Sequence, residues 1–395
     1  MSKKTISPRN IKLYYLTQFL RSLIFTIAII IVFFQLHLSV VQISLLFSLR
    51  MLTIVLAELP TGAVADMLGK KWSVFLGYIF SAVAFAFLPF NNNFLFIAFL
   101  YSFVLPIGES FLSGAKEALI YDSLKQDGLE NKYAKIKLNK NLVFQTGLII
   151  SSVLSGFMYQ YNFYLPFIAI AFAYYIAAAL CLLFIEPSID TEVFTLKNYL
   201  KQINFGAREI FKNSFLRKLS SFYVIVGAIT WSSILYFNKF LLVELGFADN
   251  TRGVIDAIIR VIIVFVLTAL MKNKRLFTKK KSIFFFPIFM AISYLPGFIL
   301  GKWNALPFLA GVMMLGTARF VILGQMVNQE FSSKYRSTAI STLSMLVSLF
   351  YIILTFISGP VIVNFGGVRM VYTLLGILSL VTVLPLAVSI VREEK

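Results

Sequence analysis

The chain has 395 residues, of which 59% are hydrophobic and 13% charged, and its mean hydropathy is +0.85. Soluble domains carry roughly 25% charged residues and have too little interior to bury so much apolar surface, so the composition excludes a soluble protein and predicts an all-α membrane protein. The formal net charge of +19 is interpreted as a signal of membrane topology and as a partner for anionic lipid headgroups, rather than as a sign of nucleic-acid binding. With one cysteine, Cys181, and one histidine, His37, we expect no disulfide, no metal site and no cofactor.

Long apolar segments recur along the whole chain. A helix that crosses a bilayer needs about 20 mostly apolar residues, and twelve segments meet that requirement. They are residues 12–37, 40–67, 72–90, 94–123, 135–160, 163–185, 217–242, 250–271, 282–300, 303–330, 335–364 and 368–391.

Positive charge follows the connections between these segments. Most of the 36 Lys and Arg residues fall into alternate loops, and residues 91–93 (Asn-Asn-Asn) carry none. Basic loops stay on the cytoplasmic side, so both termini are expected in the cytoplasm of a cell-membrane protein. Residues 187–216 form the longest connection; they are predicted to be an amphipathic helix on the inner leaflet, with a flexible linker as the alternative. The predicted domains are therefore a six-helix half at 1–186, this linker, and a second six-helix half at 217–395.

One loop carries a motif. The stretch ELPTGAVADMLGKKWSV, residues 58–74, places Gly62, Asp66, Gly69, Lys70 and Lys71 in a G-x-x-x-D-x-x-G-K-K pattern after the second predicted span. Gly69 permits a tight turn, Asp66 can pair with a cation or a helix N-terminus, and the two lysines hold the loop on the cytoplasmic side.

This pattern resembles the signature loop of the major facilitator superfamily. Together with SGAKEALIYDSL (residues 113–124) and YRSTAISTLSML (335–346), it is similar to a bacterial group of drug and metabolite exporters. The resemblance implies twelve transmembrane helices in two pseudo-symmetric six-helix halves, a monomer, and a secondary transporter rather than an enzyme.

Two family features are absent. The fifth predicted span lacks the proline that the family's antiporters carry there but keeps the small residues, Gly147, Ser151, Ser152, Ser155 and Gly156. In the fourth span, Ser110 stands where the family has an arginine. Both departures weaken the expectation of an antiporter.

Ionisable residues within spans usually face a cavity or a partner. Glu109 and Asp256 are the proton-coupling candidates, because burial opposes the charge of a carboxylate and a nearby cation supports it. The alternative is a structural ion pair, of Glu109 with Arg21 or Arg50 and of Asp256 with Arg260. The candidate substrate contacts share a cationic, aromatic or amide side chain within a span, and are Arg21, Arg50, Arg260, Arg319, Trp231 and Asn238.

A second set of charges lies nearer the cytoplasmic ends. Glu58 and Lys116 have similar predicted depths, so we expect them to pair, with Glu117 in the same network. Asp122 is expected to anchor the loop at the water boundary. The predicted gating group consists of the five motif residues together with Glu58, Lys116 and Glu117.

The predicted function is proton-coupled export of a small anionic or zwitterionic molecule by alternating access, with the lipid bilayer as the surroundings. Import or uniport of an organic anion is the alternative. A lipid scramblase or membrane enzyme fits less well, because the sequence shows no recognisable nucleophile, metal or phosphate-binding motif.

Overall fold

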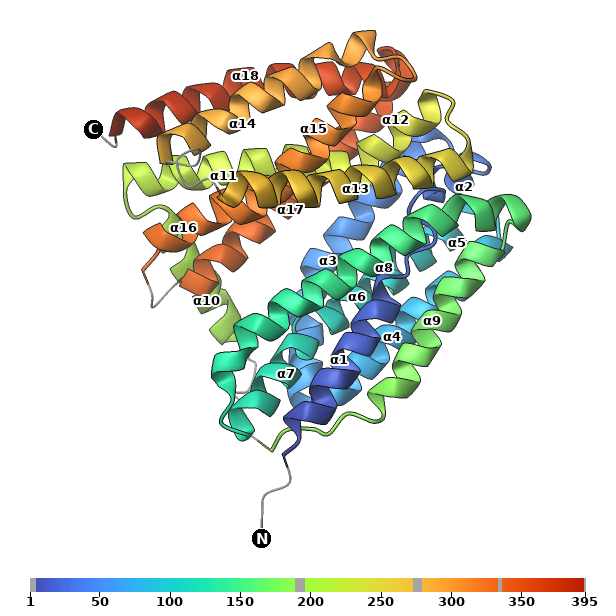
Figure 1. The fold of residues 1–395 in the computed structure, drawn as a ribbon, viewed down its shortest axis with the longest axis vertical. Helices are drawn as coiled ribbons and strands as arrows, with labels where there is room; N and C mark the ends of the chain where they lie inside the picture. The colour runs from blue at the N-terminus through green and yellow to red at the C-terminus, as the bar shows by residue number, and fades with distance from the viewer. Residues whose placement is uncertain (1–4, 189–195, 273–278, 333–335, 394–395) are drawn as a thin grey trace. The chain divides into compact units, whose positions relative to one another are not determined.

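A computed structural model describes residues 5–188, 196–272, 279–332 and 336–393. Over these residues the chain forms helices joined by turns and short loops, and the described part contains no strand. Figure 1 shows the course of the chain. The predicted all-α membrane protein is confirmed.

The chain divides into two compact units. The first comprises Met1–Phe33, Leu49–Leu196 and Asp249–Ala257, and the second comprises Phe34–Ser48, Lys197–Ala248 and Ile258–Lys395. Each unit therefore contains a short segment from the other predicted half: Asp249–Ala257 lies in the first unit and Phe34–Ser48 in the second. The predicted domain boundaries stay a prediction.

Long apolar helices account for most of the predicted spans. In the described residues, nine helical stretches are long and apolar enough to cross a membrane: Val40–Glu58, Lys70–Phe90, Phe94–Gln126, Glu130–Tyr161, Ser214–Glu244, Lys280–Ile299, Ala305–Glu330, Thr338–Asn364 and Gly367–Glu393. Three predicted spans are not among these nine. One is the shorter apolar helix α9 (Leu165–Cys181), and another is α13 (Asp249–Lys272). The third is the first predicted span, which is broken. The total of twelve stays a prediction.

The first predicted span, 12–37, is not continuous. It consists of α1 (Ser7–Ser22) and α2 (Ile30–Gln35), separated by turns. Backbone groups released at this break are bonded by serines of α8 (Tyr133–Tyr161): Ser151 donates to the Ser22 carbonyl at 3.2 Å, and the Ala28 N–H donates to Ser155 Oγ at 3.3 Å. The small-residue face of α8 thus provides hydrogen bonds to a broken helix as well as room for close packing.

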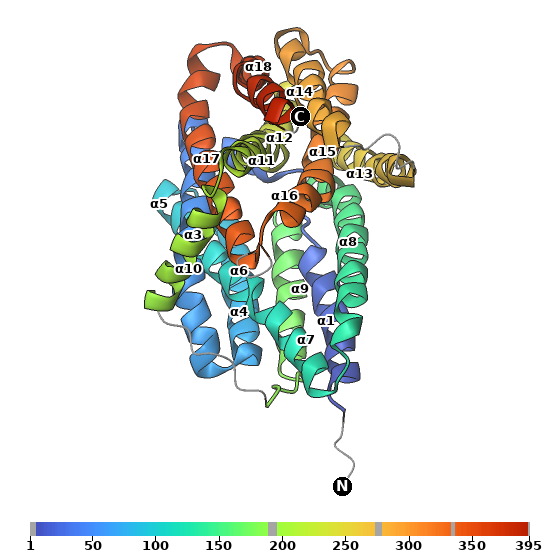
Figure 2. The same ribbon diagram turned by 90° about the vertical axis from the view of Figure 1, so that its left-hand side faces the viewer.

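The first unit is a bundle. Its other helices are α3 (Val40–Leu68, from Leu49 onward), α4 (Lys70–Phe87), α5 (Phe94–Ala98), α6 (Leu105–Ser113) and α7 (Ala115–Gln126). Helix α4 packs against α6, α7 and α9, and α1 packs against α8 and α9 (Figures 1 and 2).

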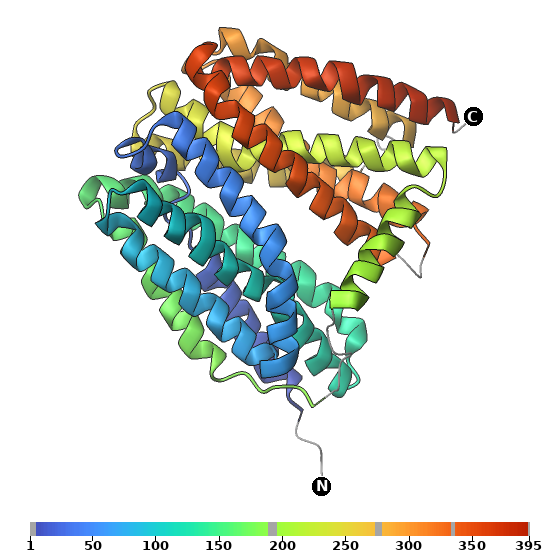
Figure 3. The ribbon, with the colours of Figure 1, turned by 180° about the vertical axis from the view of Figure 1, so that it is seen from behind.

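The second unit is built mainly on α11 (Ser214–Ser232), α14 (Lys279–Tyr294), α17 (Arg336–Asn364) and α18 (Gly367–Glu393). Helix α11 packs against α17 and α18, and α14 packs against α18 and α15 (Ala305–Ala318), as Figure 3 shows from behind. This unit also contains α10 (Leu196–Ile210), α12 (Asn238–Glu244), α16 (Gly324–Glu330), the part of α13 from Ile258 onward and the part of α3 up to Ser48.

Three spans contain a π-helical turn within the described residues. These turns are η2 (Phe99–Val104) between α5 and α6, η4 (Ser233–Phe237) between α11 and α12, and η6 (Arg319–Leu323) between α15 and α16. A π turn widens the helix locally and re-aims the side chains beside it, and such turns occur frequently at functional sites. Tyr101 and Arg319 lie within two of them, and Trp231 lies two residues before the third.

Candidate substrate and coupling site

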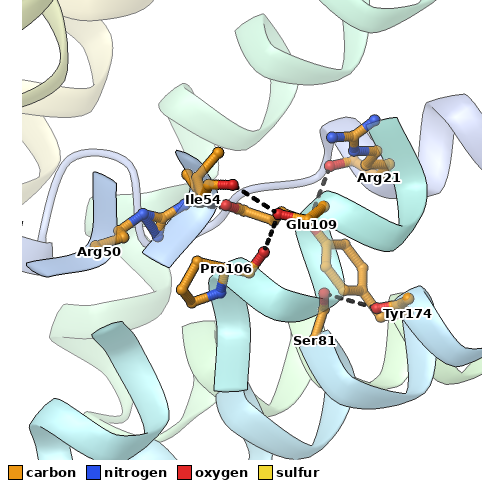
Figure 4. A network of polar contacts seen from close by, with 9 residues as sticks. Arg21, Arg50, Ile54, Ser81, Pro106, Glu109 and Tyr174 are labelled. Carbon is orange, nitrogen blue, oxygen red and sulfur yellow. Dashed lines mark hydrogen bonds and ion pairs between the residues drawn. The ribbon is translucent and has the colours of Figure 1, made fainter. Parts of the chain in front are cut away.

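Glu109 is held by an arginine on a neighbouring helix. In the first unit, Nη2 of Arg50 on α3 donates to both carboxylate oxygens of Glu109 on α6, at 2.6 and 2.5 Å (Figure 4). Both side chains are partly accessible, Arg50 at 21% and Glu109 at 29%. Of the two arginines predicted as partners, the structure selects Arg50. Arg21 enters this region through its backbone carbonyl, which accepts the Tyr174 hydroxyl at 3.2 Å.

The same arginine lies over an aromatic ring. Cζ of Arg50 is 5.0 Å from the centroid of Tyr101, a buried residue of the π turn η2. A guanidinium between a carboxylate and a ring face is fixed in orientation, because the ring's quadrupole and the carboxylate both attract the cation. Tyr101 was not identified from the sequence, where an aromatic residue in an apolar span carries no distinguishing signal.

Arg319 has different surroundings. It begins the π turn η6 in the second unit and is only 1% exposed. Its Cζ lies 5.0 Å from the ring centroid of Tyr223, 5.6 Å from Trp231 and 4.1 Å from Phe320. Nε has no hydrogen-bond partner, and the described residues place no carboxylate within ion-pair distance of this guanidinium. Arg319 is thus a buried cation surrounded by rings and lacking a counter-charge.

The aromatic cage depends on a glycine. A Cβ added at Gly227 on α11 would lie 2.1 Å from Nη1 of Arg319, so a residue with a side chain would displace the guanidinium. Trp231, one helical turn further on, belongs to this cage through its contact with Arg319. Whether substrate reaches it stays a prediction.

Asn238 lies elsewhere in the second unit. Its Oδ1 accepts a hydrogen bond from the Tyr372 hydroxyl of α18, and its buried Nδ2 has no hydrogen-bond partner among the described residues. The ring of Tyr372 is 5.5 Å from that of Tyr294, whose hydroxyl donates to Ser233 Oγ at 2.8 Å. Asn238 therefore takes part in a polar contact between helices.

Asp256 binds a serine in the first unit. Its Oδ2 accepts a hydrogen bond from Ser152 of α8 at 2.7 Å. The predicted pairing with Arg260, one turn further along α13, stays a prediction. Ser152 belongs to the small-residue face of α8, so that face also orients one of the two predicted proton-coupling residues.

The expected Glu58–Lys116 pair is wrong. In the described residues, Nζ of Lys116 donates to the Tyr78 hydroxyl at 2.8 Å and to Gln18 Oε1 at 3.3 Å, whereas Glu58 is exposed on α3. Equal depth along two helices does not imply contact, because the rotation of each helix decides where its side chains lie.

Glu117 also belongs to a separate cluster. Its carboxylate pairs with Lys140 at 2.9 Å and Lys137 at 3.4 Å, both on α8. Adjacent residues on a helix point about 100° apart, so Lys116 and Glu117 face different neighbours.

The motif loop is clamped at its turn. Gly69 has φ +93°, a conformation that favours glycine. Glu186, in the non-helical segment that follows α9, accepts hydrogen bonds from the backbone N–H groups of Lys70 at 2.8 Å and Lys71 at 2.7 Å, while the Lys70 ammonium pairs with Asp122. Asp122, expected to cap or anchor a loop at the water boundary, thus pairs with a lysine of the motif loop.

Two further motif positions lie on α3, before the turn. Asp66 is exposed and Gly62 half-buried on α3. Glu186 was missed from the sequence, although an acid placed directly after an apolar span and before Pro187 is a usable signal.

The comparisons with known proteins agree with this architecture. Residues 13–301 match the family described as the Major Facilitator Superfamily. A relative in Bacillus subtilis (strain 168), the uncharacterized MFS-type transporter YxaM, is 28% identical over 226 residues, covering 55% of this chain and 54% of the relative, so the chain spans about half the length of that curated relative.

Solved structures share the fold at low identity. The nucleoside transporter NupG superimposes with a TM-score of 0.72 at 17% identity, covering 99% of this chain and 100% of that one. The D-xylose-proton symporter gives 0.70 at 12% identity, covering 95% and 96%. Because the family match spans residues 13–301, the chain belongs to the Major Facilitator Superfamily, and its long apolar helices are those of a multi-pass membrane protein.

Proposed function

We propose that the protein exports a small organic anion or zwitterion across the cell membrane in exchange for protons, by alternating access. The observation that carries the substrate class is Arg319, a fully buried guanidinium without a carboxylate among the described residues. Leaving such a charge uncompensated is unfavourable, and a carboxylate or phosphate on the substrate would supply the missing hydrogen bonds. The three rings around it favour an apolar or aromatic body beside that anionic group.

Proton coupling is assigned to the Arg50–Glu109 pair. A proton on Glu109 would cancel the charge that holds Arg50, and a cationic group of a zwitterionic substrate would compete with that proton for the carboxylate. Exchange requires that the proton and the substrate exclude each other, and competition for the Glu109 carboxylate would meet this requirement. The exposed fractions of both side chains allow such access.

Import remains the second candidate. The fold relative crystallised as a D-xylose-proton symporter moves its substrate together with a proton, and the helix-five proline typical of antiporters is replaced here by small residues. In that case protonation of Glu109 would free Arg50 to bind an anion, so proton and substrate would bind together.

Cellular accumulation tests the substrate class. Cells that overexpress the protein and cells that lack it would be loaded with benzoate (an anion), norfloxacin (a zwitterion) or tetraphenylphosphonium (a permanent cation). We expect lower accumulation of benzoate or norfloxacin in the expressing cells and no change for tetraphenylphosphonium. Protection against the cation alone would contradict the proposal, and higher accumulation of the anion would favour import.

Coupling is tested in proteoliposomes with the probe that cells extrude. We expect Glu109→Gln to abolish accumulation driven by a pH gradient while substrate counterflow continues, because the amide keeps the shape but cannot carry a proton. Intact pH-driven transport in this variant would exclude Glu109 as the coupling residue.

A further inference from the structure

Lys116 is a buried cation that the proposed transport cycle does not yet use. It lies on α7 in the first unit and is only 2% exposed. Three helices contribute its neighbours: Tyr14 and Gln18 on α1, Tyr78 on α4, and Cys181 at the end of α9. Its Nζ lies 5.5 Å from the ring centroid of Tyr14 and 5.3 Å from that of Tyr78.

The hydrogen bonds around Nζ have a definite direction. The Tyr78 hydroxyl donates to the backbone carbonyl of Thr17 at 2.8 Å, so towards Lys116 it acts as an acceptor. Gln18 Oε1 is the second acceptor. An ammonium has three N–H donors, so two neutral acceptors leave one donor facing aromatic rings.

Lys116 lacks a counter-charge. In the described part of the chain, no carboxylate lies within ion-pair distance of Nζ, and the adjacent Glu117 is bound to Lys137 and Lys140. Arg21 on α1 and Lys140 on α8 add further positive charge nearby. Burial without an anion disfavours the ammonium and tolerates the neutral amine, which can still donate to both acceptors.

We propose that Lys116 is a second proton-carrying residue of the transport cycle, neutral in the buried arrangement seen here and protonated when the surrounding helices separate and admit water. The proton passes from water to the Nζ lone pair and returns to water when α1, α4 and α7 close again. The proposal rests on the proton-coupled function argued above. It also accounts for an ionisable residue placed where ordinary packing would favour leucine or methionine.

Proton binding by the purified protein tests this without a transported substrate. Wild-type protein and Lys116→Met would be titrated in detergent, and the difference in bound protons plotted against pH. We expect the wild type to bind one extra proton at a pH below the range of about pH 10 in which a lysine in water binds its proton, because this ammonium would be buried without a counter-charge. A difference confined to about pH 10, or no difference down to about pH 5, would overturn the proposal.

A matched control is Lys137→Met. This lysine contacts the neighbouring Glu117 but its side chain is 53% exposed, so its removal should leave the proton-uptake step assigned to Lys116 in place. Tyr78→Phe provides a second test if Lys116→Met fails to fold. It keeps the ring and removes the hydroxyl acceptor, so the one-proton step should move to lower pH. A purely structural lysine would show no step to move, and an unmoved step would overturn the assignment.

Transport assays separate this inference from the function on which it rests. If wild-type proteoliposomes move the probe without moving protons, the proposed coupling fails regardless of the titration. If the wild type is proton-coupled and the titration shows no Lys116 step, only the present inference fails. If both are correct, Lys116→Met should keep counterflow and lose accumulation driven by a pH gradient.

Discussion

At the scale of single residues, the Arg50–Glu109 pair offers a test by double substitution. Arg50→Gln leaves Glu109 without its cation, and a hydrogen bond to a charged group contributes about 1.5–3 kcal/mol, here toward the lower end because both side chains are partly accessible. Arg50→Gln combined with Glu109→Gln removes both charges, so part of the lost stability should return. Thermal unfolding in detergent measures this, and strictly additive losses would show that the two residues are not coupled.

The cage around Arg319 makes a second prediction at this scale. Gly227→Ala places a methyl group where Nη1 lies, and overpacking of this kind costs about 1–3 kcal/mol. We expect lower thermal stability and impaired binding of the anionic probe. The control is Gly324→Ala, five residues after Arg319, where an added Cβ would meet nothing closer than 3.8 Å. Equal effects of both substitutions would contradict a specific fit between Gly227 and Arg319.

At the scale of elements, α10 is docked by a buried acid. Oε1 of Glu209 accepts the backbone N–H of Ser332 at 2.9 Å, and Lys212 lies 3.7 Å away. Burial alone would raise the pKa of Glu209, but the hydrogen bond from the backbone N–H of Ser332 and the charge of Lys212 bring this pKa below its usual value. Because the folded-state pKa is the lower one, the stabilisation is fully present above the unfolded pKa and is lost as pH falls through the folded pKa.

Glu209→Gln should therefore lower the thermal unfolding midpoint at neutral pH, and the difference from the wild type should shrink below about pH 4. Comparing the midpoints of the two proteins across this range measures the effect. Lys212→Ala, which removes an exposed partner, should change little. A wild-type advantage that persists unchanged into acid would show that the carboxylate charge has no part in holding α10.

The elements also show where sequence reasoning stops. Apolar length predicts a spanning helix because the bilayer sets that length, and nine of the predicted spans appear among the described helices. The break between α1 and α2 was missed, since it lies inside an unbroken apolar run. It depends on the hydroxyls of Ser151 and Ser155, more than a hundred residues away.

At the scale of the whole molecule, class and family follow from composition and from one loop motif, whereas the partners of the buried charges do not. Arg50 and Glu109 were both singled out, and their pairing was one of two alternatives. The surroundings of Lys116 and Arg319 come from helices remote in sequence. Their aromatic neighbours, Tyr78 and Tyr223 among them, look like any other ring in an apolar span, so only the fold identifies them.

Membrane topology gives the last prediction. An even number of spans puts both termini on one side, and the basic loops place that side in the cytoplasm. A green fluorescent protein fused after Lys395 should fluoresce, and alkaline phosphatase inserted after Asn92, in the loop without charge, should be active. Phosphatase inserted after Glu130, in a lysine-rich loop, is the control and should be inactive. The described residues contain nine clear spans, which leaves the total number to be measured. A dark C-terminal fusion together with an active Asn92 insertion would indicate an odd number of crossings and rule out two six-helix halves.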